Sequence, residues 1–360
     1  ALFHQSEHLN LHQTLALRLL KEGKAFICKC TEKELENSNY YSGHCETLKE
    51  IDYEKLKASG EDFVIRVKKP SSTISYRDLF HGEQTATPNE IDSFVILRKD
   101  GTPTENFASA TDDMISNISF ILRDEKHLSN TPKQIYIKKL LGYETETHYA
   151  HLPKIVHNQG EEFSSDASSL SVKWLFEQGF IPDAILNYLL QLGNSETPTE
   201  IFTLPDAIKW FDLHKLSKST STFDLEDLRS INREHLKKID DKALSKQFGF
   251  ADADIGKLAK LYLDESATIN ELEAKIRPIF SPKDFSTELG DEMKLLSNLI
   301  FDAPAFQTLE ELTGYLKTKS NLDTIKIEHA LKLLLTGSRN GPEISKVYPL
   351  IKSYLLEVAS

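Results

Sequence analysis

Three cysteines within eighteen residues are the first feature of this sequence that could carry chemistry. They lie in the segment CKCTEKELENSNYYSGHC as Cys28, Cys30 and Cys45. In a reducing compartment, clustered thiols favour a metal ion over a disulfide, and zinc takes four N, S or O ligands in a tetrahedron. Tyr41 or His44 could fill the fourth position. The spacing therefore predicts a structural zinc site with about one ion per chain, and three unliganded thiols are the alternative.

A second feature is the loop GEEFSSDASS, which lies between an apolar segment at 151–156 and a helix expected to begin at Val172. A loop between a strand and a helix commonly binds phosphate, because backbone N–H groups and a lysine surround the anion there. This loop instead carries three carboxylates, those of Glu161, Glu162 and Asp166. Their charge would repel a triphosphate, so the loop does not have the composition of a phosphate site.

Hydrophobic periodicity predicts a mixed first half and a helical second half. Residues 9–22 have the spacing of an amphipathic helix, and strands are expected at 25–29, 63–68, 74–78 and 94–98. A helix, an apolar strand at 118–122 and a second helix at 131–141 then follow in the order typical of a parallel α/β sheet. Beyond Val172 helical periods dominate, and we expect that part to be all-α.

Length and composition set the class of protein. The chain has 360 residues, enough for two or three domains, and a formal net charge of -12. This charge argues against nonspecific coating of nucleic acid or of an acidic membrane, although a local basic face could still bind a structured RNA. No apolar run is long enough for a membrane span, and we expect a cytoplasmic monomer. The chain begins at Ala1 without a methionine, and we expect a fragment, a processed product or a truncated paralogue.

Several segments, in order along the chain, resemble the glutamyl-tRNA synthetases of bacteria. They are DGTPTENFASATDD, DDMISNISFILRDEKHLSNTPKQIYIKKLLG, YAHLP, VKWLFEQGFIPDAILNYLLQLGN, FDLEDLRSINREHL and LLTGSRNGPEISKVYPLIKSYL. The resemblance covers essentially the whole chain. It implies a class I synthetase, a ligase of protein biosynthesis that activates glutamate with ATP and magnesium and attaches it to tRNA.

The resemblance also implies a domain order. A partial class I nucleotide-binding domain, Rossmann-like and α/β, would occupy 1–24 and 101–171, interrupted by a small α+β connective insert with the zinc site at 25–100. A helical stem-contact domain would occupy 172–236 and an all-α anticodon-binding domain 237–360. The family's insert has the form C-x-C…Y-x-x-x-C, which Cys28, Cys30, Tyr41 and Cys45 fit position by position. Tyr41 is therefore preferred over His44 as the fourth zinc ligand.

The acidic loop falls where the family carries a lysine-bearing K-M-S-K-S-like signature. GEEFSSD aligns without a gap to the family's G-K-K-x-S-K-R, so that Ser164 matches and Ser165 stands at the catalytic lysine. These two serines are the positions at which the resemblance places catalysis. The family's other ATP-binding motif, an H-I-G-H-like element, is not among the given residues. We therefore expect the chain as given to bind ATP poorly.

For the amino acid, the resemblance points to Arg123, Glu105, His127 and Asn130. Arg123 is the arginine of the family's R-G-E-D, and a guanidinium can bind a carboxylate or a phosphate with two hydrogen bonds. Glu105 stands where the family has a tyrosine, and the R-G-E-D glycine and aspartate are replaced by Asp124 and Lys126. The alternative for Arg123 is a surface or interdomain ion pair.

For tRNA, the candidate contacts are basic and polar residues of the helical half: Arg229, Arg233, Lys237, Arg339 and Asn340. Lysine and arginine contacts to phosphate supply most of the sequence-independent affinity, and a solvated basic face is the alternative. The favoured hypothesis is a family member that keeps the tRNA-binding scaffold, for a glutamate or glutamine acceptor tRNA, with catalysis impaired or absent. The alternatives are a fragment of an active glutamate–tRNA ligase and a zinc-stabilised protein-binding module.

Overall fold

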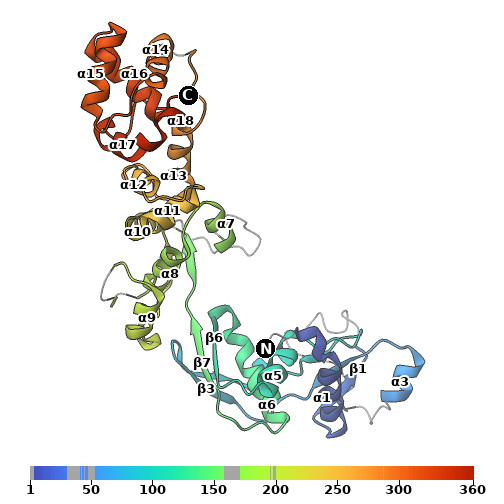
Figure 1. The fold of residues 1–360 in the computed structure, drawn as a ribbon. Helices are drawn as coiled ribbons and strands as arrows, with labels where there is room; N and C mark the ends of the chain where they lie inside the picture. The colour runs from blue at the N-terminus through green and yellow to red at the C-terminus, as the bar shows by residue number, and fades with distance from the viewer. Residues whose placement is uncertain are drawn as a thin grey trace. The chain divides into compact units, whose positions relative to one another are not determined.

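The computed structural model describes most of the chain, namely residues 4–30, 41, 43, 45–47, 53–157, 171–194, 196–197, 200–286 and 288–360. The chain divides into two compact units (Figure 1). The first comprises residues 1–154 with 217–220, and the second comprises residues 155–216 with 221–360. The acidic loop, including Ser164 and Ser165, lies outside the described residues.

The first unit is mixed α/β. Its strands are β1 (Ala25–Cys28), β2 (Val64–Val67), β3 (Ile74–Asp78), β4 (Gly82–Ala86), β5 (Val95–Leu97), β6 (Phe120–Asp124) and β7 (His148–Leu152). Its α-helices are α1 (Leu9–Lys21), α3 (Tyr53–Ser59), α4 (Pro88–Ile91), α5 (Glu105–Ile115) and α6 (Thr131–Leu140). Short 3₁₀ turns are η1 (Gln5–His8), η2 (Cys45–Thr47) and η3 (Glu125–Asn130).

Two sheets organise these elements. One is antiparallel with the order β1-β2-β5, and the other has the order β4-β3-β7-β6. In the second sheet β3 and β4 form an antiparallel hairpin, whereas β7 runs parallel to both β3 and β6. The pairing of β6 with β7 confirms the parallel sheet predicted from the strand–loop–helix order. Because parallel strands end at one edge, the sheet brings together residues that are distant in sequence.

The core of the first unit forms where α1, α5 and α6 pack with the strands. Ala16, Leu19, Phe107 and Ile137 are fully buried in it. The buried face of α1 also includes His12, a polar residue at a core position. Periodicity alone would have placed an apolar side chain there.

Strand β6 is an edge strand of its sheet and is unusually apolar on its exposed face. The side chains of Phe120 and Leu122 are 46% and 49% exposed, and only β7 pairs with β6 among the described strands. An apolar edge of this kind is a surface that readily accepts a further strand.

The second unit is predominantly helical. Its helices are α7 (Val172–Glu177), α8 (Pro182–Gln191), α9 (Leu204–Trp210), α10 (Leu225–Lys238), α11 (Asp241–Gln247), α12 (Asp254–Lys260), α13 (Ile269–Ile276), α14 (Gly290–Phe301), α15 (Leu309–Ser320), α16 (Thr324–Thr336), α17 (Ile344–Ile351) and α18 (Leu355–Val358). Turns of 3₁₀ type are η4 (Leu213–Lys215), η5 (Arg277–Ile279) and η6 (Lys352–Tyr354). The helices from α10 onward surround one large apolar core. No helix in the described ranges is both long and apolar enough to cross a membrane.

The prediction that the chain is all-α beyond Val172 is wrong at one place. Residues Ser221–Phe223 form strand β9, which pairs in parallel with β8 (Ile155–His157). Phe223 is buried against Tyr188, with ring centroids 5.2 Å apart. A strand of three residues is too short for an alternation of apolar and polar residues to be visible in the sequence. The strand was therefore not predicted among the surrounding helical patterns.

Candidate functional site

Arg123 lies near the carboxyl end of β6 and is held by several neighbours. Its Nε donates to Nε2 of His151 at 3.1 Å, and Nη2 donates to Oγ1 of Thr131 at 2.7 Å and to the His127 carbonyl at 3.5 Å. Within the described ranges, Nη1 donates no hydrogen bond to another residue. The guanidinium is therefore fixed on one side and has a further N–H group with which to bind a ligand.

A buried Asp78–His151 pair holds Arg123 in position through the imidazole of His151. Both side chains are fully buried, and Nδ1 of His151 lies 2.6 Å from Oδ2 of Asp78. Because Nε2 of His151 accepts a hydrogen bond from Arg123, the imidazole proton lies on Nδ1 and is donated to Asp78. Oδ1 of Asp78 also accepts from the backbone N–H groups of Phe80 and His81, each at 3.0 Å. These contacts connect the carboxyl ends of β3, β7 and β6 in one polar network.

The electrostatics of this network favour an ionised aspartate and a neutral histidine. Burial opposes ionisation of Asp78, but hydrogen bonds from His151, His81 and Phe80 outweigh it and lower its pKa. Burial lowers the pKa of His151, although the Asp78 carboxylate works in the opposite direction. Burial likewise lowers the pKa of Arg123, against the attraction of Asp113. An arginine remains charged at neutral pH even so.

Folding stability should therefore decrease in mild acid through His151. Its pKa in the folded chain lies below the ordinary value of 6.5, so the unfolded chain takes up the proton first. The contribution of His151 to the unfolding free energy is complete above its pKa in the unfolded chain. It is lost as the pH falls through its pKa in the folded chain. We expect His151→Gln to flatten the dependence of the unfolding free energy on pH below about 6.5. Urea unfolding at a series of pH values would measure this, with the exposed His148→Gln as control; equal slopes in wild type and His151→Gln would contradict it.

Three other predicted substrate-side residues lie around Arg123. Nδ1 of His127 lies 3.8 Å from Oε1 of Glu105 and 3.4 Å from Nδ2 of Asn130. Glu105 is the first residue of α5 and is largely exposed. The structure thus brings the four predicted residues into one group. The Glu105 carboxylate adds negative charge near Arg123, which would compete with an anionic ligand.

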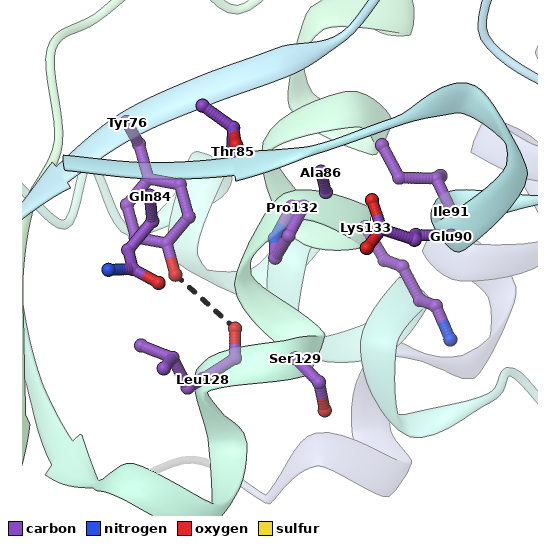
Figure 2. A pocket seen from close by; sticks show the side chains of 10 residues that line it. All are labelled: Tyr76, Gln84, Thr85, Ala86, Glu90, Ile91, Leu128, Ser129, Pro132 and Lys133. Carbon is purple, nitrogen blue, oxygen red and sulfur yellow. Dashed lines mark hydrogen bonds between the residues drawn. The ribbon is translucent and has the colours of Figure 1, made fainter. Parts of the chain in front are cut away.

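A pocket of about 240 Å³ adjoins this group (Figure 2). It lies between the β3–β4 hairpin and the start of α6, and Oη of Tyr76 donates to the Leu128 carbonyl at 3.3 Å on one side of it. Its lining is Tyr76, Gln84, Thr85, Ala86, Glu90, Ile91, Leu128, Ser129, Pro132 and Lys133. Leu128 and Ser129 belong to η3, which also carries His127 and Asn130. The pocket and the group around Arg123 therefore share the turn η3.

The three cysteines come together at the end of β1 and in η2. Sγ of Cys30 lies 3.5 Å from Sγ of Cys45, and Oη of Tyr41 lies 3.5 Å from Sγ of Cys28 and 3.7 Å from Sγ of Cys30. Zinc–thiolate bonds of about 2.3 Å in a tetrahedron place sulfurs about 3.8 Å apart. The three thiols and the phenol thus have the spacing of one tetrahedral ligand set.

Gly43 closes this cluster and leaves room for an ion. A Cβ at this position would lie 2.5 Å from Sγ of Cys30 and 2.6 Å from Oη of Tyr41, so any side chain would occupy the space between the donors. The cysteines form no disulfide. Tyr41 is the fourth donor that the described residues offer, and His44 lies outside them. The donor chemistry fits zinc.

The predicted tRNA contacts in α10 are engaged within the protein. Arg229 makes two hydrogen bonds to Glu271, at 2.7 and 3.2 Å, and Nε of Arg233 donates to the Ser266 carbonyl at 3.3 Å. Lys237 pairs with Glu234 at 2.6 Å. Arg229 is about a quarter exposed and Lys237 about half exposed, so Lys237 is the more accessible to a phosphate.

The turn after α16 carries the other two predicted contacts. Arg339 pairs with Glu288 at 2.8 Å, and the backbone N–H of Asn340 donates to Oγ of Ser338 at 3.1 Å. More than half of the Arg339 side chain is exposed. An exposed ion pair of this kind has a small net free energy.

Sequence reasoning missed three members of the Arg123 network: Asp78, Thr131 and His151. Asp78 ends a predicted strand, Thr131 begins a predicted helix, and His151 begins the predicted apolar segment at 151–156. A polar residue near the carboxyl end of a strand is the signal that could have found Asp78 and His151.

Comparisons with known proteins agree with this fold. The family model for tRNA synthetases class I (E and Q), catalytic domain, matches residues 1–230. Glutamate–tRNA ligase 2 of a Sulfurovum species is 55% identical over 363 residues, covering 100% of this chain and 85% of the relative. Glutamate–tRNA ligase 1 of a Nitratiruptor species is 45% identical over 365 residues, covering 99% and 84%.

A solved glutamate tRNA ligase from Elizabethkingia meningosepticum, in complex with its amino acid, has the same fold with a TM-score of 0.74. It is 22% identical, and the match covers 100% of this chain and 83% of that one. The fold and the family match define a class I tRNA synthetase. Within this class, the chain belongs to the glutamyl-tRNA synthetase family.

Proposed function

We propose that this chain keeps the tRNA-binding scaffold of a glutamyl-tRNA synthetase while its formation of glutamyl adenylate is impaired or absent. The observation that carries the proposal is the charge of the loop at 160–166, where Glu161, Glu162, Ser165 and Asp166 stand at four basic positions of the family. Adenylate formation requires positive groups around the triphosphate. Three carboxylates at the same place oppose that requirement.

On the amino-acid side, Arg123 would bind a carboxylate of glutamate. Its Nη1 points to this role, because the other guanidinium N–H groups already bind His151, Thr131 and His127. A fixed guanidinium loses less freedom when it binds its ligand. His127 and Asn130 would position the remaining polar groups of the substrate, and Glu105 would weaken the binding of a second negative charge. Ser164 and Ser165 would supply no charge to a phosphate.

Zinc would be held by Cys28, Cys30, Cys45 and Tyr41, and it would supply a structural cross-link rather than chemistry. The link joins β1 to η2 and so stabilises the connective insert, proposed for 25–100. We assign the partial nucleotide-binding domain to 1–24 and 101–171, the stem-contact domain to 172–236 and the anticodon-binding domain to 237–360. ATP and magnesium belong to the family's reaction.

The partner proposed for the helical half is a glutamate or glutamine acceptor tRNA. Arg229, Arg233, Lys237, Arg339 and Asn340 are the proposed contacts. Four of these five residues are basic and the chain is acidic overall, so binding would depend on local contacts to phosphate. The chain is proposed to act as a monomer.

A second candidate function is a working glutamate–tRNA ligase. It is favoured by the relative that is 55% identical and carries the name glutamate–tRNA ligase, of which this chain covers 85%. In that case residues outside the given sequence would complete the ATP site. The loop at 160–166 would then have to bind triphosphate despite its charge.

Filter binding of radiolabelled tRNA over a series of salt concentrations tests the tRNA proposal. We expect the logarithm of affinity to fall linearly with the logarithm of salt, and Lys237→Ala to reduce the slope by about one unit. The exposed Lys173→Ala, which removes a lysine outside the proposed contacts, serves as the matched control and should leave the slope unchanged. Affinity without salt dependence would reject a tRNA module in favour of a protein-binding one.

A further inference from the structure

Two histidines and an aspartate converge in the first unit, away from the cysteine cluster. Oδ1 of Asp112 lies 3.0 Å from Nδ1 of His8 and 2.8 Å from Nε2 of His12. The other carboxylate oxygen accepts a hydrogen bond of 2.8 Å from Nε2 of Gln5. The ligand atoms of His8, His12 and Asp112 all lie within 4.8 Å of one another. They are close enough to bind a single ion.

Secondary structure holds the three side chains in place. His8 ends η1, His12 lies one turn further along in α1, and Asp112 projects from α5. Two histidines four residues apart on one helical face, with a carboxylate from elsewhere, form a common arrangement for transition-metal ligands. The arrangement is rigid, because His12 and Asp112 lie in the packed interior.

Burial and access also suit an ion. His12 is fully buried and Asp112 is 8% exposed, so water competes weakly for the donor atoms. The side chain of His8 is 26% exposed, which gives an ion a path from solvent. Oδ1 of Asp112 faces both imidazoles, so the carboxylate is positioned as the third ligand.

The second nitrogen of His12 distinguishes this cluster from a pair of ordinary hydrogen bonds. Nδ1 of His12 is buried and has no hydrogen-bond partner in the described part of the chain. A buried structural histidine usually has both nitrogens bonded, which fixes its tautomer. Here the proton can move to Nδ1 and leave the lone pair of Nε2 for a metal ion.

We propose that His8, His12 and Asp112 bind a divalent transition-metal ion, with zinc as the preferred ion. The ligand set of two imidazoles and one carboxylate matches zinc, and water or the amide oxygen of Gln5 would complete the tetrahedron. Ligands at about 2.0 Å from zinc are about 3.3 Å apart, so the side chains would separate slightly from their hydrogen-bonded positions. The ion would clamp η1 and the first turn of α1 onto α5, independently of the proposed function.

Titration of the chelator-treated full chain with Co²⁺ tests this proposal. Cobalt bound to thiolates gives an intense near-ultraviolet charge-transfer band, whereas cobalt bound to nitrogen and oxygen gives only weak visible bands. We expect a binding event without the thiolate band that survives Cys45→Ser and the control His148→Gln. His8→Gln should weaken this event by more than about a hundredfold, since losing a direct ligand costs more than losing its supporting partner.

Asp112→Asn should weaken the same event, but this buried substitution could unfold the chain, so the partly exposed His8→Gln decides the matter. A shift of the melting temperature by zinc, present in Cys45→Ser and lost in Cys45→Ser/His8→Gln, would give independent support. The proposal is overturned if every bound cobalt shows the thiolate band, or if the nitrogen–oxygen event persists unchanged in a folded His8→Gln protein.

Discussion

Replacing Cys28 with serine is expected to remove zinc from the cysteine cluster, reducing the thiolate-bound metal from about one ion per chain to none. Cys28 and Cys45 are buried, and their sulfurs lie with Cys30 and Tyr41 in one donor set. Without an ion, the link between β1 and η2 depends on few apolar contacts. We therefore also expect the first unit to melt at a lower temperature, as calorimetry with metal analysis would show.

The fourth ligand can be identified with two matched variants. Tyr41→Phe keeps the ring, which packs 5.5 Å from that of Phe26, but removes the oxygen. We expect it to weaken zinc binding by more than about tenfold, whereas His44→Ala should leave binding unchanged. Competition with a chromogenic chelator measures both affinities. The opposite result, with His44→Ala weakened and Tyr41→Phe unchanged, would show that His44 is the ligand.

Removing the buried carboxylate of Asp78 is expected to have the largest effect on stability. Asp78→Ala would leave the imidazole N–H of His151 and three backbone N–H groups, those of Phe80, His81 and His151, without their acceptor in a fully buried site. Unpaired buried groups of this kind cost about 3–5 kcal/mol of unfolding free energy. Arg123 would lose its fixed position as well.

Asp124→Ala is a suitable control for Asp78→Ala, because Asp124 ends β6 in the same sheet and caps η3 at an exposed position. Loss of this cap should cost about 1 kcal/mol. Urea unfolding of the two variants, followed by a signal from the first unit, gives the comparison. Equal costs would contradict the assignment of Asp78 as the support of His151 and Arg123.

The sequence predicted those parts of the fold and the site in which the contacting residues are close in sequence or belong to a motif of fixed spacing. Cys28, Cys30 and Cys45 are close in sequence, and their sulfurs lie together around the oxygen of Tyr41, as the spacing suggests. The parallel sheet was predictable because apolar segments alternate with helical ones. The pocket beside η3 was not, since it depends on how a hairpin and a helix pack.

Long-range pairing explains what was missed. His151 and Asp78 are separated by 73 positions and meet only because β3 and β7 lie side by side. His12 lies on the buried face of an amphipathic helix, where an apolar residue is the ordinary expectation, and its partner Asp112 is 100 positions away. Strand β9 has too few residues to show a period. In each case the prediction would have required knowing which distant segments pack together in the fold.

We propose that the chain binds tRNA and that its activation of glutamate is impaired or absent. ATP–pyrophosphate exchange with glutamate and tRNA present, measured beside the 55% identical Sulfurovum ligase, tests it most directly. We predict that the relative catalyses exchange and that this chain does not, although this chain still retains tRNA on the filter. Ser165→Lys alone should not restore exchange, because the neighbouring carboxylates remain. Exchange by this chain at a rate comparable to that of the relative would contradict the claim and establish a working ligase.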